Sequence, residues 1–220
     1  MKIGILGTGE VGRALAPAFE ARGHAVAIGT RDPDLPRSAK PRLRAVLDAH
    51  PALLLVTFAE AAAEADVVVN ALPGPLCVDL LGSLADDIGG SVLMDVSSPF
   101  DGKADGAVLS PVNTDSLGEQ IQRALPRARV VKTLNTMAAA LMPDPALAGS
   151  ADQTVFISGD HGDAKQVVGL LLHDLGWRDI IDLGPIASAR APEMLLRMWI
   201  DLYKALGTDR FGFKIVRTAS

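Results

Sequence analysis

A glycine-rich turn near the start of the chain lies between a predicted strand and a predicted helix. The apolar run Lys2–Leu6 is typical of a buried strand, and Gly7-Thr8-Gly9-Glu10-Val11-Gly12 separates it from a helix predicted at 11–22. In such a G-x-G-x-x-G sequence the first glycine permits a tight turn, the second lets a pyrophosphate approach the backbone, and the third lets helix and strand pack closely. The phosphates then lie at the positive end of the helix. The turn therefore predicts a dinucleotide-binding βαβ unit.

The rest of the 220 residues continues to alternate β-rich runs with Ala- and Leu-rich segments, which is the pattern of parallel βαβ units. Strands are predicted at 25–29, 53–57, 67–71, 92–96, 130–134, 153–158 and 180–183. Helices are predicted at 58–65, from the turn at 72–75 to about residue 86, and at 116–125, 138–141, 163–175 and 191–206, with a Pro- and charge-rich loop at 31–41. We expect an α/β fold with a Rossmann-type, doubly wound, mostly parallel sheet. Residues 1–145 would form the nucleotide-binding domain, and 146–220 a small C-terminal α/β domain that ends in a long helix.

Composition excludes several classes of partner. With 21 basic and 26 acidic residues the net charge is −5, so no polybasic surface is expected for nucleic acid or anionic lipid. No apolar stretch reaches the roughly 18 residues of a membrane-spanning helix, and the first residues do not resemble a signal peptide. The single cysteine cannot form an internal disulfide, and no Cys/His cluster has metal-ligand spacing. We expect a cytoplasmic protein that binds no nucleic acid, membrane or metal.

The end of the second predicted strand indicates which dinucleotide is bound. An NAD-specific site usually has an acidic residue there for the ribose 2′-hydroxyl. Here the strand ends at Gly29-Thr30-Arg31, and a hydroxyl followed by a guanidinium suits a 2′-phosphate. NADP(H) is therefore favoured. In the alternative, Arg31 is a solvated loop charge and Asp32 binds the ribose of NAD.

Several segments resemble the NADPH-dependent reductases of coenzyme F420, and their order and spacing match that family over nearly the whole chain. They are IGILGTGEVGRALAPAFEARGHAVAIGTRDP (3–33), DVVVNALP (66–73), VVKTLNTM (130–137), GPIASAR (184–190) and GFKIV (212–216). The K-x-x-N-T and S-A-R sequences are also similar to the cytoplasmic reductase domain of the STEAP metalloreductases, which passes hydride from NADPH to a flavin.

The resemblance implies direct hydride transfer between C4 of the nicotinamide and C5 of a deazaflavin, or N5 of a flavin. Such a reaction needs positioning and electrostatics more than acid–base groups. The resemblance places Leu72 and Pro73 beside the nicotinamide, and Asn135, Thr136 and Met137 at the junction of the two rings. Met137 would lie behind the nicotinamide; the alternative is ordinary core packing. The small C-terminal domain would then cover the acceptor.

The long helix predicted at 191–206 has an apolar stripe and an opposite polar face. The stripe consists of Leu195, Trp199, Leu202 and Leu206, and the polar face includes Glu193. Arg190, at the start of this helix, is expected to reach the acceptor; alternatively it pairs with Glu193 three residues later. The stripe is compatible with a homodimer, which the family tends to form. Cys77 is interpreted as a small buried hydrophobe, with a place near the nicotinamide as the alternative.

The chain departs from archaeal members of the family near the expected acceptor. Asn135 and Ala138 stand where those enzymes tend to have histidine and proline, and Met194 and Leu196 stand where they have serine or threonine. The acceptor surface is thus expected to be more apolar, which a flavin could also use.

We therefore expect a hydride-transferring oxidoreductase whose small-molecule partners are NADP(H) and coenzyme F420. One alternative is an NADPH-dependent flavin reductase that feeds ferric iron. Another is a redox sensor that binds NADP(H) without turnover. An open cleft facing the nicotinamide would favour an enzyme, and a filled cleft beside an exposed apolar patch would favour a sensor.

Overall fold

The computed structural model describes residues 1–34, 40–100 and 108–218 and contains one continuous sheet. Its eight strands have the order β3-β2-β1-β4-β5-β6-β7-β8. All neighbours are parallel except β6 and β7, which are antiparallel. The strands are β1 (Lys2–Leu6), β2 (Ala25–Thr30), β3 (Leu54–Thr57), β4 (Val67–Asn70), β5 (Val92–Asp95), β6 (Arg129–Thr133), β7 (Thr154–Ser158) and β8 (Asp179–Asp182).

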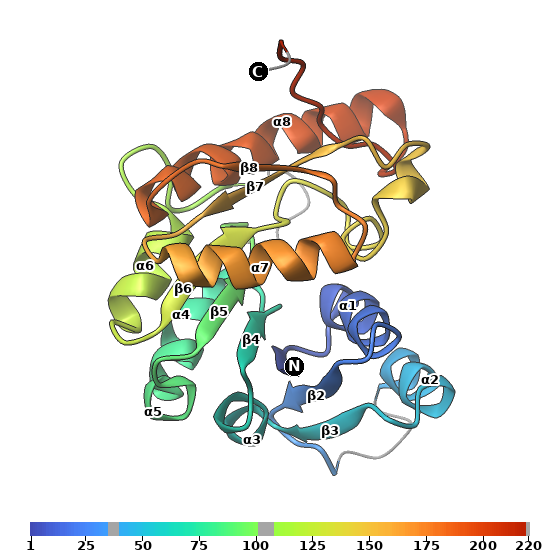
Figure 1. Ribbon diagram of the computed structural model, residues 1–220, viewed down its shortest axis with the longest axis vertical. Coiled ribbons are helices and arrows are strands. Elements are labelled where there is room, and N and C mark those ends of the chain that lie inside the picture. Colours follow the sequence, from blue (N-terminus) through green and yellow to red (C-terminus); the bar gives the residue numbers. More distant parts are fainter. Residues whose placement is uncertain (35–39, 101–107, 219–220) are drawn as a thin grey trace.

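Helices cover both faces of the sheet, so the strands at its centre are buried on both sides and are almost wholly apolar. One face packs against α1 (Glu10–Glu20), α2 (Pro41–Ala49) and α7 (Gly162–Asp174). The other packs against α3 (Phe58–Ala63), α4 (Gly74–Ser83), α5 (Ala85–Ile88) and α6 (Leu117–Ala124). Figure 1 shows α8 (Arg190–Leu206) lying across the end of the molecule opposite α2 and β3. Two short 3-10 turns, η2 (Pro145–Ala148) and η3 (Ile186–Ala189), precede β7 and α8.

Local sequence explains how β3 turns directly into α3. The Thr57 side chain accepts a hydrogen bond from the Glu60 N–H at 3.2 Å, and the Glu60 carboxylate accepts one from the Thr57 N–H at 2.8 Å. This reciprocal capping box satisfies donors that a helix start would otherwise leave unpaired. The apolar side of α3 can therefore begin immediately at the edge of the sheet.

The predicted fold class is confirmed, and all eight predicted strands form within one or two residues of their expected bounds. Two helix predictions need correction. The sequence did not indicate α2, where Pro41 occupies the first helical turn, a position that proline favours. The helix predicted at 138–141 is wrong, because these residues form turns. Four residues before Pro143 are too few for a helix without strong packing.

The predicted boundary at residue 145 falls in η2, between β6 and β7. The sheet passes through this point, because β6 and β7 are hydrogen-bonded neighbours. The division into 1–145 and 146–220 stays a prediction. Within the described ranges, no helix is both long and apolar enough to cross a membrane.

Candidate active site

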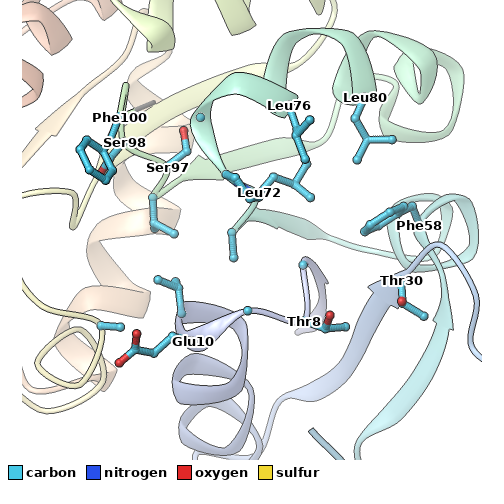
Figure 2. A pocket seen from close by; sticks show the side chains of 18 of the residues that line it. Thr8, Glu10, Thr30, Phe58, Leu72, Leu76, Leu80, Ser97, Ser98 and Phe100 are labelled. Carbon is cyan, nitrogen blue, oxygen red and sulfur yellow. The ribbon is translucent and has the colours of Figure 1, made fainter. Parts of the chain in front are cut away.

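The carboxyl ends of the central strands surround a cleft of about 720 Å³. It lies where the chain, having built β2 and β3 on one side of β1, starts β4 on the other, and Rossmann sheets bind their ligands at this crossover. Figure 2 shows Thr8, Glu10 and Thr30 on one side of the cleft, and Leu72, Leu76 and Ser97 on the other. The residues predicted for the site that line this cleft are Gly7, Thr8, Gly9, Glu10, Val11, Thr30, Arg31, Leu72, Pro73 and Met137.

The three glycines of the turn have three different surroundings. Gly7 has a φ of +127°, in the region that glycine tolerates, and a Cβ there would lie 2.6 Å from the Ala71 carbonyl oxygen. A Cβ on Gly12 would lie 2.1 Å from the Gly7 carbonyl oxygen, so α1 packs tightly on the turn. Gly9 has nothing within 4 Å of a Cβ and faces open space. Two of the glycines therefore shape the turn, and the third leaves room for a ligand.

The start of α1 is suited to an anion. Gly9 is the N-cap residue, and no side chain caps the helix, so the N–H groups of its first turn remain for a ligand. Arg13 donates from its guanidinium to the Thr8 carbonyl at 2.9 Å, which fixes the turn on the helix. In Figure 2 the Glu10 carboxylate points away from Thr30. The N–H donors of the first turn and the helix dipole both favour an anion at this position.

A cationic corner lies at the end of β2. Thr30 is buried and Arg31 exposed, and both line the cleft, as does Asp32. The ammonium of Lys40 donates to the hydroxyls of Thr8 (3.1 Å) and Thr30 (3.0 Å). Lys40 was not predicted as a site residue, because it belongs to no motif and follows a Pro-rich stretch of sequence. Both of these acceptors are uncharged, so the positive charge of Lys40 has no carboxylate partner among the described residues and could attract an anion into the cleft.

The opposite wall of the cleft is mostly apolar. Besides Leu72 and Pro73, it is lined by residues that the sequence analysis did not assign to the site, namely Leu76, Leu80, Val96, Ser97, Ser98 and Phe100. The sequence did carry a signal for some of these residues. Residues 96–100 directly follow the buried strand β5, and the carboxyl ends of parallel strands meet at the ligand site. A flat ring can therefore lie against this wall with little competition from water.

The segment after β6 brings Met137 into the cleft but not its two predecessors. Leu134 has a φ of +57°, an uncommon conformation for a residue with a side chain, and it turns the chain sharply after the strand. Asn135 is buried and donates from Nδ2 to the Pro192 carbonyl at 2.8 Å, at the start of α8. Thr136 is also buried, and neither lines the cleft.

Arg190 and Glu193 do not pair with each other: Arg190 contacts Glu119, and Glu193 contacts Lys132. The Arg190 guanidinium donates to Glu119 at 2.8 Å and lies outside the cleft lining. Arg190 is the main reason that the pKa of Glu119 is lowered. Glu193, expected on the polar face of α8, is 1% exposed and pairs with Lys132 at 3.0 Å. The pairing of Arg190 with Glu193 is therefore wrong, and a contact of Arg190 with an acceptor stays a prediction.

Cys77 is fully buried, as its reading as a small hydrophobe expects. The pKa of its thiol is raised to about 11, mainly because the thiol is buried and secondly because the negative charge of Asp95 is nearby. It does not belong to the cleft lining. In the part of the chain that the structure describes, no group of three His, Cys, Asp or Glu side chains could hold a metal ion.

The doubly wound sheet, the glycine turn and the cleft define a dinucleotide-binding protein of the Rossmann class. Residues 2–99 match the family model described as NADP oxidoreductase coenzyme F420-dependent. The F420-dependent NADP reductase of Methanothermobacter marburgensis is 30% identical over 208 residues, which cover 92% of each chain. This chain therefore belongs to the family of coenzyme F420-dependent NADP oxidoreductases, and the predicted family and enzyme class are confirmed.

Two further relatives are informative. A crystal structure from Arthrobacter sp. FB24, proposed to be an F420-dependent NADP reductase, is 50% identical, with a TM-score of 0.94 over 99% of this chain and 100% of that one. Rat metalloreductase STEAP3 is 30% identical over 195 residues, or 88% of this chain. The match spans only 36% of the rat protein, about a third of its length.

Proposed function

We propose that the chain transfers a hydride between NADP(H) and coenzyme F420. The observation that carries the proposal is one open cleft with a phosphate-binding turn and a cationic corner on one side and an apolar wall on the other. Two relatives of this chain, from Methanothermobacter marburgensis and M. thermautotrophicus, are F420-dependent NADP reductases. When both are bound, NADPH supplies the hydride from C4 and the deazaflavin accepts it at C5, with one proton taken from water to complete the balance.

The residues present suit NADP(H). We assign the pyrophosphate to the turn Gly7–Gly12 and the first N–H groups of α1, where Gly9 leaves space. We assign the 2′-phosphate to Thr30, Arg31 and Lys40, which offer a hydroxyl and two cationic groups. Asp32 lies at the same corner, and its negative charge would repel a phosphate, but the positive charges of Arg31 and Lys40 compensate it. The predicted preference for NADP(H) therefore rests on a charge balance of two cations to one carboxylate.

The residues of the chain would position the nicotinamide and the acceptor and would not transfer a proton. Leu72 and Pro73 would hold one side of the nicotinamide and Met137 the other, with aliphatic and thioether groups that exclude water without hydrogen bonding to the ring. Asn135 would act from the second layer, because its amide ties the turn before Met137 to α8. Arg190, held by Glu119, would have to change partner to reach an acceptor. Direct hydride transfer requires chiefly that the nicotinamide and the acceptor ring be aligned in this way.

A spectrophotometric assay tests the proposal. The purified protein is mixed with NADPH and, separately, with coenzyme F420, FMN and FAD, and loss of the nicotinamide absorbance is followed. We expect the nicotinamide absorbance to fall when F420 is the acceptor, and not when FMN or FAD is. The Arg31→Ala variant should raise the KM for NADPH much more than that for NADH, and equal preference before and after the change would remove the assignment of Arg31.

A flavin is the second candidate acceptor, and two observations favour it. The chain shares 30% identity with metalloreductase STEAP3, and its cleft wall is apolar where a flavin ring could also lie. Turnover with FMN or FAD, and none with F420, would establish this alternative. The cleft is open rather than filled by side chains, which favours an enzyme over a sensor without turnover.

We also propose a cytoplasmic homodimer. Met194, Met198, Tyr203 and Leu206 of α8 are between 37% and 56% exposed, and a second copy could cover these apolar side chains. The free thiol of Cys77 suits a reducing compartment. Light scattering on the eluting protein should give twice the 23.0 kDa chain mass, and Met198→Glu should give a monomer. A monomeric wild-type protein would contradict the proposal.

A further inference from the structure

A row of buried polar side chains crosses three neighbouring strands just beneath the cleft. Asn70, Asp95 and Lys132 occupy matching register positions on β4, β5 and β6, and each is at most 1% exposed. Matching positions on parallel strands face the same side of a sheet, so the side chains touch. Asn70 donates to Asp95 at 2.9 Å, and the Lys132 ammonium donates to the other Asp95 oxygen at 2.9 Å. Buried charges are costly unless they are fully paired, so this row calls for an explanation.

One end of the row fixes two segments of the cleft wall. Asp95 accepts from the Ser97 N–H (3.1 Å) and hydroxyl (2.6 Å), and Lys132 donates to the Ser97 carbonyl at 2.6 Å. Asn70 accepts from the Leu72 N–H at 3.2 Å. Both Ser97 and Leu72 line the cleft. The row therefore determines where the wall beside the nicotinamide position lies.

The other end of the row holds the start of α8. Lys132 forms an ion pair with Glu193 at 3.0 Å, although 60 residues separate them in the chain. The Glu193 carboxylate also accepts from the N–H groups of Leu117 (2.7 Å) and Gly118 (2.9 Å), in the first turn of α6. The residue before Glu193 is the one whose carbonyl accepts from Asn135. Lys132 is thus the group common to the cleft wall and the C-terminal helix.

Lys132 keeps its positive charge at neutral pH. Burial by itself lowers the pKa of its ammonium, but the Asp95 and Glu193 charges together outweigh burial, and the pKa is raised. The residue is also outside the cleft lining. Its charge therefore serves to hold its partners.

We propose that Lys132 is a positioning residue, which couples the start of α8 to the Leu72 and Ser97 segments and so sets the spacing of the hydride-transfer cleft. The inference rests on the proposed function. Displacement of a reacting group by about 1 Å costs on the order of 100-fold in rate. Loosening either end of the link should thus slow hydride transfer. The proposed phosphate sites lie in the turn between β1 and α1, at the end of β2 and at Lys40, and should keep their affinity.

The test weakens the contact of Lys132 with Asp95 in one variant and its contact with Glu193 in another, using amide side chains of the same shape that can still form hydrogen bonds. Asp95→Asn and Glu193→Gln should each lower kcat about 10- to 100-fold, with the KM for NADPH changed by less than about 3-fold. The double variant should be no slower than the slower single variant, because both changes break the same link. Two independent losses that multiply in the double variant would overturn the proposal.

Two controls separate positioning from stability. Asp201→Asn removes a carboxylate that pairs with Arg197 on the exposed side of α8, and should leave kcat unchanged. Leu175→Ala removes a buried side chain next to α7, and should lower Tm without changing the kcat of the folded enzyme. If Glu193→Gln behaves like Leu175→Ala, with a lower Tm and wild-type kcat, then Lys132 only stabilises the fold and the proposal is refuted.

Hydrogen exchange supplies a readout that does not depend on activity. Glu193→Gln should increase amide exchange in peptides that contain Leu72 and Ser97, and Asp201→Asn should not. Unchanged exchange in Glu193→Gln would overturn the coupling. If the wild-type enzyme transfers no hydride between NADPH and F420, the proposed function fails, but the exchange experiment still decides whether Lys132 links α8 to the cleft wall.

Discussion

Replacing Lys40 by glutamine should reduce the preference for NADPH over NADH without unfolding the protein. The lysine ammonium rests on the hydroxyls of Thr8 and Thr30, at 3.1 and 3.0 Å, and lines the cleft beside Arg31. A glutamine amide can still donate to one of these hydroxyls, but it brings no charge. The variant therefore removes the attraction for a 2′-phosphate and leaves the local packing nearly as it was.

The size of the effect follows from the kind of hydrogen bond that is lost. A hydrogen bond to a charged group contributes about 1.5–3 kcal/mol, which corresponds to roughly 10- to 150-fold in an affinity or a specificity constant. This factor should appear in kcat/KM for NADPH and be nearly absent for NADH, which has no 2′-phosphate. Because the corner is open to solvent, added salt should shrink the wild-type preference more than that of the variant.

Steady-state rates with both nucleotides, measured at low and high ionic strength, provide the assay. Arg42→Gln is the matched control, since Arg42 is exposed, lies two residues further on and does not line the cleft. The control should keep the wild-type preference. If Lys40→Gln weakens NADPH and NADH use by the same factor, then the lysine does not contact the 2′-phosphate, and the assignment of this corner is wrong.

Three further predictions concern stability and reactivity. Gly12→Ala should lower the free energy of unfolding in urea by about 3 kcal/mol or more, because the new Cβ would lie 2.1 Å from a backbone oxygen. Gly9→Ala should lower it by under about 1 kcal/mol but weaken NADPH binding at least about 10-fold. Equal losses of unfolding free energy in the two variants would contradict this prediction. Lys132→Met should cost about 3–5 kcal/mol in urea at pH 7. Because the folded pKa of Lys132 is raised, its contribution is full below the ordinary value of 10.5 and is lost as pH rises through the folded pKa, so a cost that grew with alkalinity would refute the ion pairing. Cys77, with a pKa of about 11, should resist a disulfide reagent at pH 8 until guanidinium unfolds the chain, and rapid native labelling would show that it is accessible.

The sequence was sufficient for the strands because parallel strands buried on both faces are nearly continuous apolar runs. Val67–Val69 shows this, and so does β1, which is buried from Ile3 to Leu6. α2 was missed because its sequence, PRLRAVLDA, is polar and buries Leu43 alone. Val46 and Leu47 pack partly buried against the same core as Leu43, so tertiary packing, together with Pro41 in the first turn, favours a helix here.

The site was predicted in part, for a related reason. Residues of the glycine turn and the end of β2 belong to a local pattern, so the sequence indicates them directly. Lys40 and Glu193 act through partners that lie between 10 residues away, as Thr30 does, and 76 residues away, as Leu117 does. Glu193 even has the helical spacing of a solvated polar face. Which charges become buried is decided by the approach of α8 to β6, and a helical period carries no information about that approach.

The uninterrupted sheet limits how this enzyme can move during turnover. Many nucleotide-dependent enzymes open and shut by swinging two bodies about a hinge, and the hinge is a short stretch of chain. Here β6 and β7 are joined by backbone hydrogen bonds, so such a swing would tear the sheet at its antiparallel step. Entry and exit of the nucleotide are therefore expected to depend on side chains and turns at the rim of the cleft and not on a swing at this step.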